Sequence, residues 1–229
     1  RVKIILIRKH KTGGFMKRSK PNLTENLEST DDLLAMIDWA NEEELEIEGK
    51  HFKDLTLMEI DFSRLSFRES LFENCEFSDC NFEKIDCRDL RFQSCNLSNS
   101  NFADGYFNRC EFKSCKMIGV DFHQAQLQDL LFSDSNFQYG NFSKAKLKAI
   151  EISECDFGHT TISECKLSQI ELDRVNFEAA SFFKTPLKGL DFTNSQIDGL
   201  IVSIEALSGA IVTTYQAAEL AKLLGLIVR

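Results

Sequence analysis

Apolar residues recur at every fifth position along most of this chain. From Phe52 to Val212 every fifth residue is hydrophobic, which gives 33 consecutive positions, and 18 of the 20 Phe residues fall in this register. At 43% hydrophobic residues overall, chance would produce such a run with a probability of about 10⁻¹². The run is therefore an internal five-residue repeat.

A period of five fits neither regular secondary structure. Five residues rotate an α-helix by about 500°, so successive copies form no stripe, and on a flat strand an odd spacing alternates between faces. The chain must therefore turn once per pentad to keep every copy inside. The residue two before each central position lies on the same face of its short strand. Many of these second inward positions are small: Ser70, Cys75, Cys80, Cys95, Ser100, Gly105, Cys110, Cys115, Ala125, Ser135, Ala145 and Cys155.

Three units show the repeat most clearly: Cys80-Asn81-Phe82, Ser100-Asn101-Phe102 and Gly140-Asn141-Phe142. Their pattern, a small residue, then Asn or Asp, then Leu or Phe, resembles the pentapeptide-repeat family over residues 50–212. The resemblance implies an all-β solenoid, a right-handed quadrilateral parallel β-helix with four pentads per coil. The 33 pentads then make about eight coils, and strands ~4.8 Å apart give a rod about 40 Å long. Residue n lies above residue n+20.

We expect a helix at each end to cover the unpaired strand edges. Residues 1–28 are predicted to be a flexible extension, within which Met16 resembles a natural start, so that residues 1–15 are an upstream addition. Residues 29–49 are predicted to be a capping helix and lead-in. The N-terminal helix is expected over about residues 31–40, capped by Ser29 or Thr30. Its packing side chains are expected to be Leu33, Leu34, Ile37 and Trp39.

Residues 213–229 are predicted to form a C-terminal helix and tail. Thr213 or Thr214 caps this helix, and Gly225 ends it. The apolar surface exceeds what a lid needs, so we favour a homodimer; a monomer whose helix only seals the last coil is the alternative. The predicted interface consists of Tyr215, Ala217, Leu220, Ala221, Leu223, Leu224, Leu226 and Ile227.

The sequence offers no catalytic, cofactor or metal site. All eight cysteines occupy inward positions, where Cys behaves as a small hydrophobe. Their spacings follow the repeat and not the spacing of zinc ligands. His51, His123 and His159 project to three different outer faces, and no phosphate-binding glycine loop or nucleophile elbow occurs. We predict a protein that is not an enzyme and has no cofactor.

The formal net charge is −9, with 27 Lys and Arg against 36 Asp and Glu. Such a chain is not expected to bind nucleic acid directly, which needs clustered cations. No apolar run reaches the ~20 residues of a membrane span, and no secretory signal is evident. We expect a cytoplasmic protein with no membrane partner.

The C-terminal coils resemble the end of quinolone-resistance (Qnr) pentapeptide-repeat proteins. The resemblance lies in Leu187-Lys188-Gly189-Leu190-Asp191-Phe192, Leu207-Ser208-Gly209, Gln216-Ala217-Ala218 and Leu224-Gly225-Leu226-Ile227-Val228. It implies a DNA mimic that binds bacterial DNA gyrase or topoisomerase IV and protects the enzyme from fluoroquinolones. Many Qnr proteins carry projecting loops that contribute to protection. The unbroken register here leaves no room for them, so such a rod can instead bind gyrase and simply inhibit it.

Projection at 20 residues per coil places a group of acidic residues on one face of the C-terminal coils, with Arg174 as the interspersed cation. The adjacent face carries Lys146, Lys148, Lys166 and Lys188. Two alternatives to gyrase protection stay open: a scaffold rod with an unrelated protein partner, and immunity against a gyrase poison. The predicted gyrase-binding residues are Asp134, Glu151, Glu154, Glu171, Asp173 and Asp191.

Overall fold

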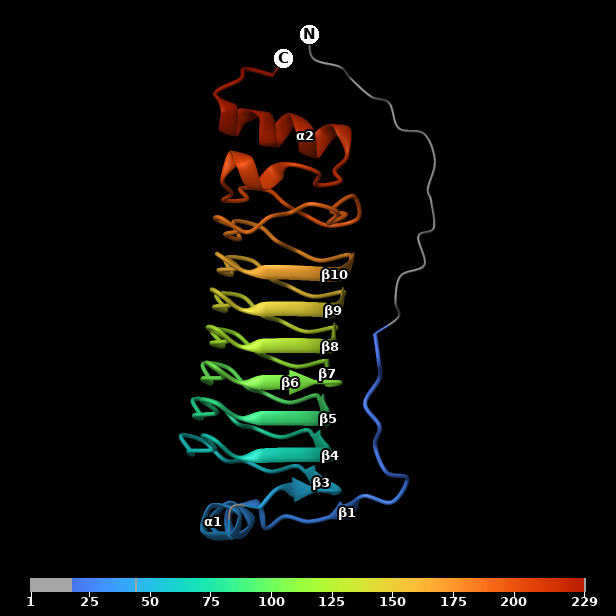
Figure 1. Ribbon diagram of the computed structural model, residues 1–229, viewed down its shortest axis with the longest axis vertical. Coiled ribbons are helices and arrows are strands. Elements are labelled where there is room, and N and C mark those ends of the chain that lie inside the picture. Colours follow the sequence, from blue (N-terminus) through green and yellow to red (C-terminus); the bar gives the residue numbers. More distant parts are fainter. Residues whose placement is uncertain (1–17, 44, 229) are drawn as a thin grey trace.

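Short parallel strands stack one above the next along a column, with a helix at each end (Figure 1). The computed structural model describes residues 18–43 and 45–228. The predicted break before Met16 lies outside these residues. The strands are β1 (Glu28–Ser29), β2 (Ile47–Glu48), β3 (Lys50–Lys53), β4 (Ser66–Glu73), β5 (Asp86–Gln93), β6 (Tyr106–Asn108), β7 (Glu111–Lys113), β8 (Gln126–Ser133), β9 (Lys146–Ser153) and β10 (Lys166–Asp173).

Pairing between neighbouring strands follows the expected shift of 20 residues. Phe72 of β4 lies beside Phe92 of β5, which in turn lies beside Phe112 of β7. Each eight-residue strand bends around a corner, and β4 does so at Glu69, where φ is 44°. One long strand therefore contributes to two sides of the column.

Four faces result, as the resemblance to pentapeptide-repeat proteins implied. The first face contains residues 66–68 and their equivalents in other turns, and the second contains residues 70–73 and their equivalents. Isolated bridges form the third face, from Thr56 to Gln196, and the fourth, from Asp61 to Ile201. The chain is thus the expected quadrilateral parallel β-helix. Its strands occupy about seven turns, slightly fewer than the expected eight, because the last pentads pair only through single bridges.

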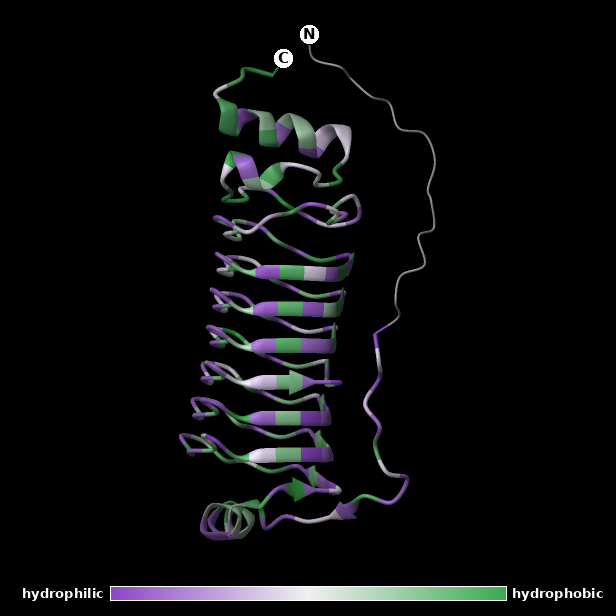
Figure 2. Cartoon of the chain, in the orientation of Figure 1, coloured by the Kyte–Doolittle hydropathy of each residue, from purple (hydrophilic) through white to green (hydrophobic). Residues whose placement is uncertain are grey.

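Stacked phenylalanine rings fill the interior. In one ladder the ring centroids of Phe62 and Phe82 are 4.5 Å apart, those of Phe82 and Phe102 4.6 Å, and those of Phe102 and Phe122 5.1 Å. Rings from neighbouring faces meet edge to face, as Phe72 and Phe77 do at 5.7 Å. Both arrangements suit the quadrupole of the aromatic ring. Along the strands, hydrophobic residues alternate with hydrophilic ones (Figure 2).

The turn required in each pentad is made by one residue in the left-handed conformation. It lies two positions after each central residue, and every such position from Asp54 to Lys184 has a positive φ. This conformation brings Cβ close to the following carbonyl in an L-residue. Nearly all of these corners nevertheless carry a side chain, Gly119 being the glycine in that range.

The N-terminal helix α1 (Leu33–Glu43) begins and ends later than expected. Its first turn is capped by Asp32, whose Oδ1 accepts a hydrogen bond from the Ala35 N–H at 3.3 Å. The predicted cap Ser29 lies in β1 instead. Leu33 and Ile37 are buried as expected. Leu34 and Trp39 are 46% and 50% exposed, so the prediction that they pack was wrong: the helix presents a narrower side to the column.

The C-terminal helix α2 (Thr214–Ala221) is capped by Thr213, whose side chain accepts from the Gln216 N–H. The short helices η1 (Ile204–Leu207) and η2 (Lys222–Leu224) flank it, and the chain turns at Gly225, with φ 74°. Gln216 is buried and donates to the carbonyls of Phe192 and Ser195, both at 2.8 Å. These bonds fix the helix to the last coil. Within the described residues, no helix is long and apolar enough to cross a membrane.

Candidate protein-binding surface

The predicted acidic residues lie on the second face and at its corner with the third face. Glu151 of β9 and Glu171 of β10 are direct partners in the strand ladder. Glu154 lies at the corner in the left-handed conformation, as does Asp134 one turn earlier. Five of the six side chains are exposed, and Asp173 is half-buried. The shift of 20 residues therefore brings the six onto one side of the rod.

Ion pairs reduce the negative charge of this surface. Arg174 pairs with Glu154, and its Nη1 lies 2.8 Å from Asp173 Oδ2. The hydrogen bond from Arg174 lowers the pKa of Glu154. Among the described residues no ion pair involves Asp134, Glu171 or Asp191. These three carboxylates can therefore bind a cation of another molecule without first breaking an ion pair within this protein.

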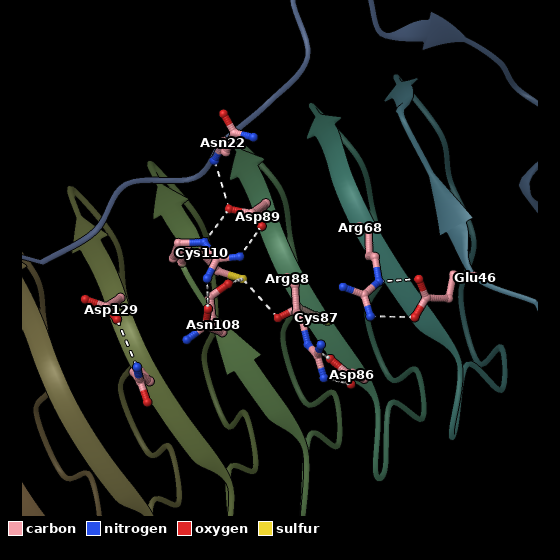
Figure 3. Close-up of polar contacts among 12 residues, drawn as sticks. Asn22, Glu46, Arg68, Asp86, Cys87, Arg88, Asp89, Asn108, Cys110 and Asp129 are labelled. Atoms are coloured by element: carbon pink, nitrogen blue, oxygen red, sulfur yellow. Dashed lines mark hydrogen bonds and ion pairs between the residues drawn. The ribbon is translucent and has the colours of Figure 1, made fainter.

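The neighbouring first face differs in charge. Lys146 and Lys166 are ladder partners in β9 and β10, and Lys148 lies in the same strand as Lys146. Nearer the N-terminus this face carries paired charges, such as Arg88 and Asp86 at 2.8 Å, and Arg68 with Glu46 (Figure 3). The C-terminal coils thus have a cationic side next to an anionic one, which orients an approaching charged partner.

An N-terminal strap, residues 18–22, lies against the rod. The Ser19 N–H donates to Asp129 Oδ1 at 2.8 Å. The Asn22 N–H donates to Asp89 Oδ1 at 2.9 Å, as Figure 3 shows. Both acceptors belong to the corner between the first and second faces. Figure 1 shows the chain running alongside the column here. The sequence predicts a flexible segment over residues 1–28, and the described part of that segment begins with these contacts.

Arg18 of the strap has an almost fully enclosed side chain. Its Nη2 lies 2.9 Å from Glu111 Oε1 and its Nε 3.1 Å from Glu151 Oε2, and only 7% of the side chain is exposed. Sequence reasoning missed this site, because Glu111 occupies an ordinary outward position in its pentad. The one available signal was the concentration of cations before residue 21.

Glu111 is almost fully buried, with 2% of its side chain exposed. Burial opposes its charged form, but hydrogen bonds from Lys113, Arg18 and Arg91 outweigh that effect and lower the pKa of Glu111 to about 2. Its Oε2 lies 3.0 Å from both Arg91 Nε and Lys113 Nζ. Glu111 is therefore ionised at neutral pH, at the centre of a cationic cluster.

The cysteines take no part in any site. All eight are buried, as their inward positions predicted, and all are free thiols. Burial raises the pKa of Cys110 to about 12, so its thiol is a poor nucleophile. Over residues 18–43 and 45–228, no group of three or more His, Cys, Asp or Glu side chains is placed to hold a metal ion.

The C-terminus presents a second candidate surface, which is apolar. Tyr215 is 69% exposed and Ile227 is 87% exposed. Leu223, Leu224 and Leu226 are exposed with them, whereas Leu220 packs against the core. Of the eight residues predicted at the dimer interface, Leu220 therefore faces inward. Hydrophobic residues dominate the end of the chain (Figure 2).

Two protein-family models match the chain. The model described as a pentapeptide repeat region matches residues 85–162, and that of the SV2A/B/C luminal domain matches residues 35–122. No curated protein matches the sequence significantly.

Several solved structures resemble this one. HetL, a pentapeptide-repeat protein involved in heterocyst differentiation regulation from the cyanobacterium Nostoc, superposes with a TM-score of 0.53 at 12% identity, over 72% of this chain and 92% of that chain. Full-length QnrB1, a plasmid-mediated fluoroquinolone resistance protein, gives 0.46 at 24% identity, over 87% and 95%. The likeness to HetL is a likeness of fold.

The family match falls within the five-residue register that runs from Phe52 to Val212. In the structure, each pentad of that register makes one left-handed corner, and four pentads complete one turn of the column. Sequence pattern, family match and coil geometry agree: the chain has the quadrilateral β-helix fold, and its residues 85–162 match the pentapeptide repeat region.

Proposed function

We propose that this protein is a DNA mimic that binds bacterial DNA gyrase or topoisomerase IV through the acidic side of its C-terminal coils. The observation that carries the proposal is the alignment of Glu151, Glu171 and Asp191 at 20-residue intervals, with Asp134, Glu154 and Asp173 beside them. These six acids span three turn spacings, or about 14 Å at ~4.8 Å each. Duplex DNA carries about eight phosphates over that length, so the charge densities are of the same order.

The C-terminal resemblance to Qnr proteins supports this proposal, and its residues have structural roles here. Gly189 and Gly209 have φ values of 85° and 83°, and Gly225 ends the last helix. Gln216 joins the C-terminal helix to the last coil. The residues that resemble Qnr proteins therefore shape the C-terminal end of the rod. The argument for a basic partner rests on the acidic side.

Two copies joined through the C-terminal helix would place their acidic sides next to one another. We propose this homodimer because the exposed apolar surface there includes Tyr215, Leu223 and Ile227. Such a dimer would present one acidic band at its centre. The protein would then act as a binding protein in the cytoplasm, where topoisomerases work on DNA, and not as an enzyme.

The test is a gyrase supercoiling assay with the purified full chain, with and without a fluoroquinolone. Rescue of supercoiling in the presence of the drug would support protection. Inhibition without rescue would keep the DNA mimic and discard protection. No effect at tens of micromolar would overturn the gyrase proposal and favour a scaffold rod.

A matched pair of variants tests the binding face. The triple reversal Glu151→Lys, Glu171→Lys and Asp173→Lys should abolish the effect on gyrase. The control Glu164→Lys, Glu178→Lys and Asp198→Lys changes the net charge equally at exposed positions elsewhere on the same coils. It should retain most of the effect. Equal loss in both variants would mean that net charge, and not this face, determines binding.

A further inference from the structure

The strap matches the rod in spacing as well as in charge. Ser19 contacts Asp129 and Asn22 contacts Asp89, and these acceptors are 40 residues, or two turns, apart. Two turns rise about 10 Å, which is the length that three extended residues cover. An extended chain laid along the column therefore reaches from the corner carboxylate of Asp129 to that of Asp89 over three residues.

Arg18 fills a socket of defined chemistry. Glu111 and Glu151 are also two turns apart, and Leu131 lies between them in the ladder. Leu131 is 9% exposed. The guanidinium reaches one carboxylate through Nη2 and the other through Nε. Arginine suits this geometry better than lysine because its donors are spread over a rigid planar fork.

The rod does not depend on the strap to hold this socket. Glu111 keeps Arg91 and Lys113 as partners when Arg18 is absent. Asp89 is held by Arg109 Nε at 2.7 Å, and Asp129 accepts from Gln128 at 3.2 Å. Glu151 has Arg18 as its ion-pair partner among the described residues. Three of the four carboxylates that contact the strap, those of Glu111, Asp89 and Asp129, therefore keep partners within the rod, as they would at the binding site of a separate ligand.

The distribution of charge favours exchange with another basic segment. Residues 1–20 contain eight Lys and Arg and no acid, whereas residues 21–229 contain 19 Lys and Arg against 36 Asp and Glu, a net charge of −17. A basic protein surface that approaches the second face must compete with the chain's own cations. Glu151 belongs both to the strap contact and to the predicted partner surface.

We propose that the strap is an internal competitor: Arg18 occupies a guanidinium socket, formed by Glu111, Leu131 and Glu151, that accepts an arginine of a basic protein partner when the strap is displaced. The identity of that partner as gyrase rests on the proposed function. The socket and the competition rest on the contacts of residues 18–22.

Strap docking is measured by hydrogen exchange of the full chain, with Arg18→Gln compared with Lys20→Gln. Lys20 is exposed, and both changes remove one positive charge. Arg18→Gln should speed exchange of the Ser19 and Asn22 amides about tenfold or more, and Lys20→Gln should leave it near the wild-type rate. Equal rates in Arg18→Gln and wild type would overturn the docking role of Arg18.

Competition is measured with a hepta-arginine peptide, and hepta-lysine as its control. Hepta-arginine should speed exchange at Ser19 in the wild type, and it should bind Arg18→Gln several-fold more tightly than Lys20→Gln. Adding Glu151→Gln to Arg18→Gln should reverse the gain, and hepta-lysine should show a smaller difference. If the peptide binds Arg18→Gln and Lys20→Gln equally, the socket proposal is overturned.

Gyrase binding by the same two variants is a separate measurement. Tighter binding by Arg18→Gln than by Lys20→Gln would identify gyrase as a partner that uses the socket. If gyrase binds neither variant nor the wild type while the peptide result holds, the proposed function fails and the socket stands. If gyrase binds all three equally, the strap does not compete with it, which overturns the regulatory part of the inference.

Discussion

Arg18 and Glu111 are 93 residues apart in the chain, yet their side chains meet at 2.9 Å with 7% and 2% of their surfaces exposed. A buried ion pair is stable only when hydrogen bonds satisfy both groups. Here Glu111 accepts from Arg91 and lies beside Lys113, while Arg18 also donates to Glu151. The pair joins the start of the described chain to the middle of the rod.

Removal of the Glu111 carboxylate should destabilise the protein. Glu111→Gln leaves Arg18, Arg91 and Lys113 without their shared anion, and we expect a loss of about 2–3 kcal/mol. Chemical denaturation at neutral pH measures it. Glu171→Gln, an exposed carboxylate on the same face, should change stability by less than about 0.5 kcal/mol. Similar effects in both variants would contradict a structural role for the buried cluster.

The lowered pKa of Glu111 predicts that the stability of the protein depends on pH. The pKa of Glu111 falls from 4.5 to about 2 on folding, so the unfolded chain binds its proton first as pH drops. The stabilisation is complete above about pH 4.5 and is lost as pH falls toward 2. The stability difference between wild type and Glu111→Gln should therefore shrink over that interval. A difference that stays constant between pH 6 and pH 2.5 would argue against a lowered pKa.

Interruption of the aromatic ladder should be costly. Phe102 is 0% exposed and stacks against Phe82 and Phe122. Phe102→Ala removes both stacking contacts and leaves a cavity, which typically costs about 3–5 kcal/mol. Phe183, which lies outside the register, is 46% exposed. Phe183→Ala should cost less than about 1 kcal/mol in the same denaturation experiment, and comparable losses would count against the ladder as a main source of stability.

The effect of a substitution at a left-handed corner on stability should depend on the shape of the new side chain. Lys144 is exposed with φ 61°. Lys144→Val places a β-branched side chain there and should destabilise the protein by about 1 kcal/mol or more. Lys144→Gly should be neutral or stabilising, because relief of the backbone strain offsets the greater entropy of unfolded glycine. The reverse order of melting temperatures would mean that the corner is not strained.

The proposed dimer predicts a change in mass in solution. Ile227→Asp places a charge on the exposed C-terminal surface and should convert a dimer to a folded monomer, as measured by sedimentation and circular dichroism. Met58→Asp alters a 53% exposed apolar residue in the N-terminal part of the rod and should leave the dimer intact. A wild-type protein that sediments as a monomer at tens of micromolar would exclude the C-terminal dimer.

The repeat by itself determined that the chain turns once per pentad, because a period of five leaves the chain one way to bury every Phe of the register from Phe52 to Phe192. The same periodicity, which the sequence displays directly, also placed the eight cysteines inside. The pairing of residue n with n+20 came from the resemblance to pentapeptide-repeat proteins, which implies four pentads per coil, and it placed Glu151 and Glu171 on a common side. The sequence did not determine that Asp32 caps the N-terminal helix or that Trp39 is exposed. A short helix at the end of a rod can begin at several neighbouring residues and can pack through more than one side.

Only the tertiary structure decided how the outer side chains pair. Outward positions carry no periodic signal, so nothing in the pentads distinguishes buried Glu111 from exposed Glu171. Burial of Glu111 comes from the cations around it and from the strap, whose residues lie far away in the chain. A long-range contact of this kind depends on the completed rod, because its carboxylates come into line only when the turns have stacked.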